Sequence, residues 1–219
     1  KTWDLNHLNN LYTTWEEAND PEPLDGVIIT GAPVEHLAFE EVKYWDEFVN
    51  ITNEARNSCA STLGLCWAGF ALAYLAGVNK TVFDKKLFGV FPLKSLAPGH
   101  PLMGTQDDEF ICPQSRFAGL PDLEMEEAQK EGKLNLLAYG KDVGYTIFET
   151  KDQKQLMHLG HPEYTVHRII SEINRDKEKG DVPPPENFNI NCSNTSWRSH
   201  RNLLFQQWLW FCYQQVSLN

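Results

Sequence analysis

The chain has little positive charge. Its 219 residues include 19 Lys and Arg against 30 Asp and Glu, which gives a formal net charge of −11. Nucleic acids and anionic membrane surfaces are bound through clustered positive charge, and the sequence contains no run of Lys and Arg. We therefore expect neither a nucleic-acid partner nor a membrane partner, and small molecules or other proteins become the expected ligands.

A long hydrophobic run is also lacking. The most apolar stretch, residues 62–78, is interrupted by Gly64, Gly69 and Gly77 and is shorter than the roughly 20 apolar residues that a membrane span requires. The first residues of the chain have neither an apolar core nor a small-residue cleavage site, so they do not predict a signal peptide. The expected location is the cytoplasm.

The sequence contains no closely spaced pair of cysteines. The five cysteines form an odd, widely spaced set with no C-x-x-C pair, which argues against a disulfide framework and against a zinc ribbon. They are Cys59, Cys66, Cys112, Cys192 and Cys212. The histidines do not have the spacing of metal ligands either, so we expect no bound metal and no bound cofactor.

Hydrophobic periodicity predicts strands that alternate with helices. Helices are predicted at 4–18, 39–57, 67–75, 165–179 and 197–216, and strands at 24–31, 59–65, 134–139, 143–149 and 155–160, with short strands and turns over 87–120. This order predicts one α/β domain over residues 1–219, with a mostly parallel sheet, helices on both faces and ligands beyond the carboxyl ends of the strands. Residues 181–219 are expected to form a C-terminal extension whose final helix packs on the domain. Such a sheet normally begins with a strand, so we expect N-terminal strands to be missing.

The sharpest local pattern is Gly64-Leu65-Cys66-Trp67-Ala68-Gly69, which lies where a predicted buried strand turns into a helix. A strand–turn–helix elbow exposes a nucleophile above the sheet, and small flanking residues permit the tight turn. The helix N-terminus favours a thiolate and offers backbone N–H groups, here that of Trp67, to an oxyanion. The plain alternative is that Cys66 is one more buried cysteine.

A second pattern, Gly160-His161-Pro162-Glu163-Tyr164, follows the last predicted strand. A cysteine nucleophile needs a base, and the base needs a third group that fixes its tautomer. His161 and Glu163 can supply both from the same sheet edge as Cys66. Alternatively, the His-Pro pair is only a turn and Glu163 only an acid near a helix N-terminus.

Three basic residues are candidates for binding a carboxylate in this acidic protein: Lys86, Arg116 and Arg175. An Arg side chain can hold a carboxylate with two parallel hydrogen bonds, as an amino-acid substrate would require. Surface ion pairing is the competing explanation for each of them.

The chain resembles the homoserine O-acyltransferase (trans-succinylase) family along nearly its whole length. The matching stretches are Ile29-Thr30-Gly31-Ala32-Pro33-Val34-Glu35, Phe39 to Trp45, Ser61-Thr62-Leu63 with Cys66-Trp67, Lys86 to Phe91, Asp107 to Phe110, Ser115-Arg116, Gly160 to Tyr164, and Ser196 to His200 with Asn202 to Phe205. The family transfers an acyl group from acyl-CoA to the hydroxyl of an amino acid, and its fold resembles that of class I glutamine amidotransferases.

The resemblance implies a role for each matching residue. Cys66 would carry the acyl group as a thioester, His161 would act as the general base and Glu163 would orient it. Lys86, Ser115, Arg116 and Arg175 match substrate-binding positions of the family. Glu35 falls where the family separates acyl donors, and a carboxylate there would repel the carboxylate of a succinyl group. Acetyl-CoA is thus the expected co-substrate.

Three departures from the family pattern leave alternatives open. Phe70 replaces a usual Gln, Pro92-Leu93-Lys94 replaces a Glu-His-Arg-like stretch, and Gln114 and Phe117 flank Ser115-Arg116 where His and His or Tyr are usual. The acceptor is therefore either L-homoserine or L-serine. A glutaminase or thiol amidohydrolase is the alternative enzyme, and a binding or regulatory domain without activity is the third hypothesis. Oligomeric state stays open, with a homodimer among the expectations.

Overall fold

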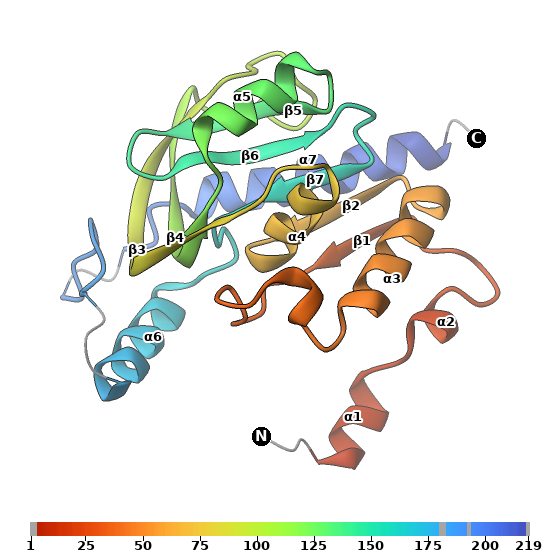
Figure 1. Cartoon of the computed structure of the whole chain (residues 1–219), viewed down its shortest axis with the longest axis horizontal. Coiled ribbons are helices and arrows are strands. Elements are labelled where there is room, and N and C mark those ends of the chain that lie inside the picture. The colour runs from red at the N-terminus through yellow and green to blue at the C-terminus, as the bar shows by residue number, and fades with distance from the viewer. Residues whose placement is uncertain (1–3, 180–182, 192–193, 218–219) are drawn as a thin grey trace.

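The protein folds around one sheet of mixed strand orientation in the computed structural model, which describes residues 4–179, 183–191 and 194–217 (Figure 1). The strand order is β1-β2-β7-β6-β5-β3-β4. The strands are β1 (Gly26–Ile29), β2 (Ser61–Leu65), β3 (Thr81–Ser95), β4 (Glu109–Gly119), β5 (Leu134–Gly140), β6 (Gly144–Thr150) and β7 (Gln155–His158). The helices are α1 (Leu5–Leu11), α2 (Trp15–Ala18), the 3-10 turn η1 (Phe39–Glu41), α3 (Trp45–Ser58), α4 (Trp67–Leu75), α5 (Asp122–Lys130), α6 (Val166–Lys179) and α7 (Arg198–Ser217).

The α/β class with helices on both faces is confirmed, but the expectation of a mostly parallel sheet is wrong. Strands β1, β2 and β7 pair in parallel, whereas β7–β6, β6–β5, β5–β3 and β3–β4 are antiparallel. The connection from β5 to β6 spans only residues 141–143, and a connection that short can join only antiparallel neighbours. The parallel strands β2 and β7 end immediately before Cys66 and three residues before His161.

Two hydrophobic cores lie on the two faces of the sheet. Helices α3, α4 and α5 cover one face through Phe48, Phe70 and Met125. Helix α7 covers the other face through Trp208, Phe211 and Cys212, together with the segment after β3. The indole Nε1 of Trp208 also donates to the Ser61 hydroxyl at 3.1 Å, which fixes α7 on β2.

Several predicted elements differ from those observed. The helix expected over 4–18 is two short helices without buried side chains, because Thr14 and Glu17 form a capping box that starts α2. The helix expected over 39–57 is η1 followed by α3, and the short strands expected over 87–120 are the long strands β3 and β4. Strand β1 lies at a sheet edge and is only partly buried.

One helix, α5, was not predicted. It buries only Met125 and Ala128 and is otherwise polar, so its hydrophobic periodicity is weak. Four cysteines, Cys59, Cys66, Cys112 and Cys212, are buried free thiols, and Cys192 lies outside the described residues. Within the described ranges, no helix combines the length and the hydropathy needed to cross a bilayer.

Candidate active site

Cys66 stands at a sharp turn between β2 and α4. Its backbone has φ 51° and ψ −116°, a left-handed conformation that costs energy for a residue with a side chain. Its N–H donates to the carbonyl of His158 at 2.8 Å, and Trp67 begins the helix immediately afterwards. A strained nucleophile position between a strand and a helix is the geometry of a nucleophile elbow.

Two glycines make room for this elbow. A Cβ on Gly64 would lie 2.8 Å from Leu72 Cδ1 and 3.0 Å from the backbone of Ala68, so any side chain would separate the strand from the helix. A Cβ on Gly31 would lie 3.0 Å from the Cβ of Cys66. The spacing of small residues that marked this segment in the sequence therefore has a steric cause.

His161 and Glu163 form the pair expected from the second pattern. Nδ1 of His161 lies 2.7 Å from Oε1 of Glu163, and the imidazole stacks on the ring of Tyr164 at 4.2 Å. Burial lowers the pKa of His161, but the charge of Cys66, its hydrogen bond to His161 and the carboxylate of Glu163 raise that pKa to about 10. A protonated imidazole beside a thiol favours the thiolate.

A cavity of 520 Å³ connects Cys66 and His161 with a charged cluster. The predicted residues that line it are Cys66, His161, Lys86, Ser115, Arg175 and Glu35. Glu35 borders the cavity and is 9% exposed, and its charge also acts on Lys80, whose pKa burial lowers and Glu35 raises. The structure thus brings together six residues that are widely separated in the sequence, from Glu35 to Arg175.

The centre of the charged cluster is Glu172 on α6, which the sequence did not single out. Its Oε1 accepts hydrogen bonds from Lys86 Nζ at 2.7 Å, from the Ser115 hydroxyl at 2.7 Å and from Arg175 Nη2 at 2.8 Å. Burial raises the pKa of Glu172, but the bonds from Lys86 and Ser115 lower it to about 2. The carboxylate is therefore charged at any physiological pH.

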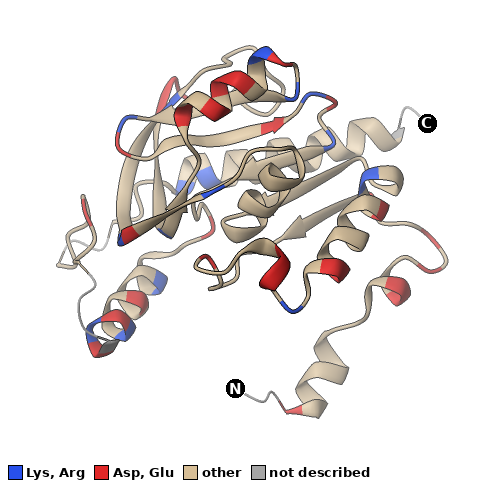
Figure 2. Ribbon diagram, viewed as in Figure 1, with Lys and Arg blue, Asp and Glu red and all other residues tan. Residues whose placement is uncertain are grey.

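Further residues of α6 complete the cluster. Asp176 accepts from Lys86 Nζ at 2.6 Å and from Arg175 Nε at 3.0 Å, and Arg168 lies over the ring of Tyr164. Figure 2 shows both signs of charge interleaved along α6. Arg168, Glu172 and Asp176 follow one another at intervals of four residues, which places them on one helix face. This four-residue spacing is the only sequence pattern that could have indicated the cluster. Charged residues on a solvent-exposed helix face show the same spacing, so the sequence alone does not distinguish the two.

Arg116 does not line this cavity. Its side chain is 1% exposed, and it donates to the Gln114 side chain at 3.1 Å, to the Val143 carbonyl at 2.6 Å and to the Ala118 carbonyl. Burial lowers its pKa to about 10, which leaves it charged at neutral pH. Its guanidinium binds within β4 and to the connection between β5 and β6, so the structure does not bring Arg116 to the ligand position expected for it.

The side chain of Trp67 serves packing, whereas its backbone faces the elbow. The ring lies against Phe48 and Tyr44 at centroid distances of 5.2 and 5.6 Å and is 2% exposed. Its N–H is the first of α4 and therefore has no partner within the helix. An anion next to Cys66 could accept this hydrogen bond.

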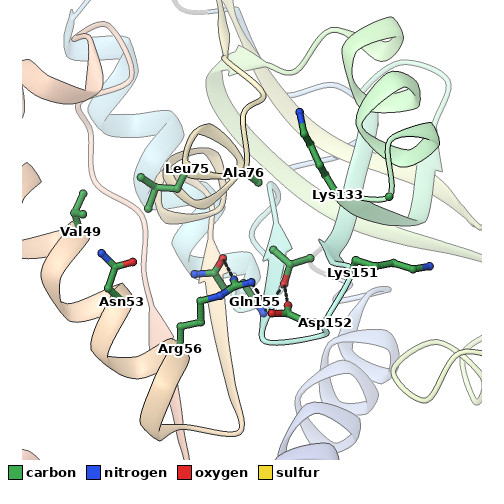
Figure 3. A pocket seen from close by; sticks show the side chains of 11 residues that line it. Val49, Asn53, Arg56, Leu75, Ala76, Lys133, Lys151, Asp152 and Gln155 are labelled. Atoms are coloured by element: carbon green, nitrogen blue, oxygen red, sulfur yellow. Dashed lines mark hydrogen bonds and ion pairs between the residues drawn. The ribbon is translucent and has the colours of Figure 1, made fainter.

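A second cavity, of 510 Å³, lies where α3, α4 and β6 end and β7 begins (Figure 3). Arg56 lines this cavity and donates hydrogen bonds to Gln155 at 3.1 Å and to Asp152 at 2.5 Å. Lys133 is paired with Glu131 at 2.6 Å, and Lys151 points away from the cavity in the figure. This cavity shares no residue with the one at Cys66, and of its charged lining residues Arg56 and Asp152 pair with each other.

The described residues hold no group of three or more His, Cys, Asp or Glu side chains that could bind a metal ion. The arrangement at Cys66 instead offers a thiol, a protonated base and an N–H donor, with ion pairs that could recognise a small charged molecule. These are the components of acyl-transfer or amide-hydrolysis chemistry.

Comparison with known structures agrees with this geometry. A glutamine amidotransferase of Thermotoga maritima superimposes with a TM-score of 0.66 at 13% identity, over 92% of this chain and 81% of that one. The glutaminase domain of a Trypanosoma brucei CTPS superimposes with a TM-score of 0.52 at 12% identity, over 82% and 84% of the two chains. At such low identity the likeness shows the fold alone, and it confirms the expected glutamine amidotransferase-like architecture.

Sequence comparison gives the family. A family model described as homoserine O-succinyltransferase matches residues 1–218. A homoserine O-acetyltransferase of Bacillus subtilis is 38% identical, over 96% of this chain and 71% of the relative, and a homoserine O-succinyltransferase of Psychromonas ingrahamii is 36% identical, over 96% and 70%. These matches cover nearly all of the chain at well over 30% identity, and the chain therefore belongs to the homoserine O-succinyltransferase family of homoserine O-acyltransferases.

Proposed function

We propose that the protein transfers an acetyl group from acetyl-CoA, through a thioester on Cys66, to the side-chain hydroxyl of L-homoserine or L-serine. The observation that supports it best is the single cavity that joins Cys66 and His161 to a cluster of paired charges. The first part can form and resolve a thioester, and the second part can hold an amino acid.

The proposed reaction has two half-reactions. In the first, the Cys66 thiolate attacks the acetyl carbonyl carbon, the carbon–sulfur bond to CoA breaks, and His161 gives its proton to the departing CoA thiolate. In the second, neutral His161 takes the proton of the acceptor hydroxyl, the hydroxyl oxygen bonds to the acetyl carbon, and Cys66 leaves as a thiolate. His161 ends protonated, as it began.

Two groups assist these steps in the proposal. The Trp67 N–H donates to the oxyanion that develops on the acetyl oxygen, aided by the positive end of the α4 dipole. Glu163, at 2.7 Å from Nδ1, keeps Nε2 of His161 as the nitrogen that exchanges protons with the reactants.

The charged cluster provides the proposed contacts for the acceptor. A free amino acid carries a carboxylate and an ammonium group close together, and the cavity is bordered by two cations, Lys86 and Arg175, and by the carboxylate of Glu172 that pairs with both. Arg175 is the most accessible of these, with 46% of its side chain exposed, so its guanidinium can turn to the carboxylate. Glu172 would accept hydrogen bonds from the ammonium group. The Ser115 hydroxyl, which donates to Glu172, would lie next to that group.

Glu35 supports the choice of acetyl-CoA as donor. Its carboxylate borders the same cavity as Cys66, and a succinyl group bound to Cys66 would bring a second carboxylate into that space. Two like charges in a poorly screened pocket repel each other. The relatives include both acetyltransferases and a succinyltransferase by name, so this residue carries the donor proposal.

The proposal is tested by mass spectrometry of the protein after incubation with acetyl-CoA and no acceptor. An acetyl group should appear on the peptide that contains Cys66 and should leave when L-homoserine or L-serine is added. Active enzyme whose Cys66 stays unmodified would refute the thioester mechanism. Parallel assays of CoA release with the two acceptors would identify the preferred one.

A second candidate activity, glutamine amide hydrolysis, rests on the fold shared with a glutaminase domain and on the Cys66–His161–Glu163 arrangement. Release of ammonia from L-glutamine, abolished in Cys66→Ala, would favour it. The family assignment favours acyl transfer instead.

A further inference from the structure

His158 links the two halves of the candidate active site. It ends β7 and is 1% exposed, and it pairs with Leu65 across the parallel ladder. Its carbonyl accepts the N–H of Cys66 at 2.8 Å, so the backbone of residue 158 fixes the strained elbow. The chain then needs only three more residues to reach His161.

The turn from His158 to His161 is held by three consecutive backbone N–H groups. Leu159 donates to the Thr146 carbonyl at 2.9 Å and His161 to the Pro113 carbonyl at 2.8 Å. The middle donor, Gly160, instead donates to Nδ1 of the His158 ring at 3.0 Å. Since Gly160 is buried, losing this acceptor would leave its N–H unpaired inside the protein.

The surroundings leave the turn little freedom to find another acceptor. A Cβ on Gly160 would lie 2.5 Å from Nε2 of Gln114 and 2.9 Å from the Pro113 carbonyl oxygen. Strand β4 therefore presses directly against this residue. A shift of the turn away from β4 would also move His161 relative to Cys66.

The protonation state of His158 suits this role. Because Nδ1 accepts a hydrogen bond, the neutral ring carries its proton on Nε2, which faces the Cys112 sulfur at 3.8 Å. Burial, the charge of His161 and the charge of Arg116 lower the pKa of His158 to about 3. The ring stays neutral and keeps its acceptor throughout the physiological range.

We propose that His158 is a positioning residue that sets His161 against Cys66, its carbonyl holding the elbow and its Nδ1 holding the Gly160 turn. It does not line the cavity, so it acts through the other two residues rather than on substrate. The proposal rests on the roles proposed above for Cys66 and His161.

Three substitutions separate the hydrogen bond from mere packing. In His158→Asn the amide oxygen can accept the N–H two residues on, as in an Asx-turn, so the Gly160 bond is preserved. In His158→Gln the oxygen falls near the place of Nε2, too far along the side chain, and His158→Leu has no acceptor. We expect kcat close to wild type for Asn and a fall of about 10- to 100-fold for Gln and Leu, with KM little changed.

Two measurements distinguish positioning from a general loss of stability. The first is the rate at which iodoacetamide alkylates Cys66, followed on the Cys66 peptide, which should fall in the Gln and Leu variants and hold in the Asn variant. The second is a control variant, Leu156→Ala, which removes a buried side chain from the same strand. It should lower the melting temperature while leaving kcat and Cys66 alkylation near wild type.

An unchanged kcat in His158→Leu, or an Asn variant as impaired as the Gln variant, would overturn the proposal. If His158→Leu does not fold, the comparison of Asn with Gln decides alone. Failure of the underlying function looks different: Cys66→Ala would then retain acyl transfer, whatever residue stands at position 158.

Discussion

Replacing Glu35 by Gly should convert the donor preference from acetyl-CoA toward succinyl-CoA. Glu35 lines the cavity at Cys66 and only 9% of the residue is exposed. With a succinyl carboxylate about 5 Å away and an effective dielectric constant of about 20, the repulsion is about 3 kcal/mol. Partial solvent access reduces this figure, and we expect the ratio of kcat/KM for succinyl-CoA to that for acetyl-CoA to rise by about 10- to 100-fold, since 1.4 kcal/mol is tenfold.

The assay is CoA release with a saturating amino-acid acceptor, measured for both donors with the wild type and two variants. Glu35→Gln is the matched control, because it removes the charge and keeps the size of the side chain. If repulsion dominates, Gln should give most of the gain that Gly gives. If Gly gains and Gln does not, the side chain excludes succinyl by its volume.

One result would refute the reasoning about Glu35 altogether, namely an unchanged donor ratio in both variants. A fall in activity with both donors alike would also contradict it, because such a fall would assign Glu35 to folding or to the acceptor. Melting temperatures of the three proteins, compared beforehand, show whether all of them are folded.

Three further outcomes are expected. The pKa of His161 is raised to about 10 from an ordinary value near 6.5, against the effect of burial, first by Cys66 and then by Glu163, so its contribution to stability is complete below pH 6.5 and is lost as the pH rises toward 10. Glu163→Gln should remove part of that loss of unfolding free energy, measured by urea unfolding between pH 6 and pH 10, and an unchanged profile would contradict the pairing of His161 with Glu163. Lys86→Met should lower the free energy of unfolding by about 3–5 kcal/mol, because it leaves Glu172 and Asp176 buried without the cation that they share. A loss below about 1 kcal/mol would show that Arg175 alone balances the two carboxylates. Arg56→Met should lower the free energy of unfolding by at most about 1 kcal/mol, because the side chains of Arg56 and Asp152 are each about 40% exposed. The substitution should leave kcat unchanged, and a loss of activity would connect the second cavity with the first.

The elbow was predictable from the sequence because local rules determine it. Glycines at 64 and 69 around a cysteine, with β-type residues before and Ala-rich residues after, define a strand, a turn and a helix within fifteen residues. The strand from Ser61 to Leu65 and the helix from Trp67 to Leu75 follow that pattern closely.

The sheet orientation and the acidic half of the cluster depended on distant contacts. Glu172 and Asp176 read as charges on an exposed helix, and only the approach of Lys86 from β3 and Ser115 from β4 buries them. Likewise, the antiparallel half of the sheet follows from the pairing of β3 with β4, which are separated by residues 96–108. No local pattern in the sequence specifies the β3–β4 pairing or the burial of Glu172 and Asp176, whereas the short connection 141–143 does specify that β5 and β6 are antiparallel.

The ion pairs of the cluster have a consequence for how a ligand is selected. Within the cluster, the four ion-paired residues balance one another: Lys86 and Arg175 carry two positive charges, and Glu172 and Asp176 two negative ones. A molecule with one charge of each sign can exchange partners with these groups and leave every charge compensated. A molecule with a single charge cannot do so, since it leaves one protein group of the cluster without a counter-ion. Discrimination in favour of zwitterions, and weak dependence of their binding on salt, would then arise from competition among existing bonds rather than from attraction by an excess of charge.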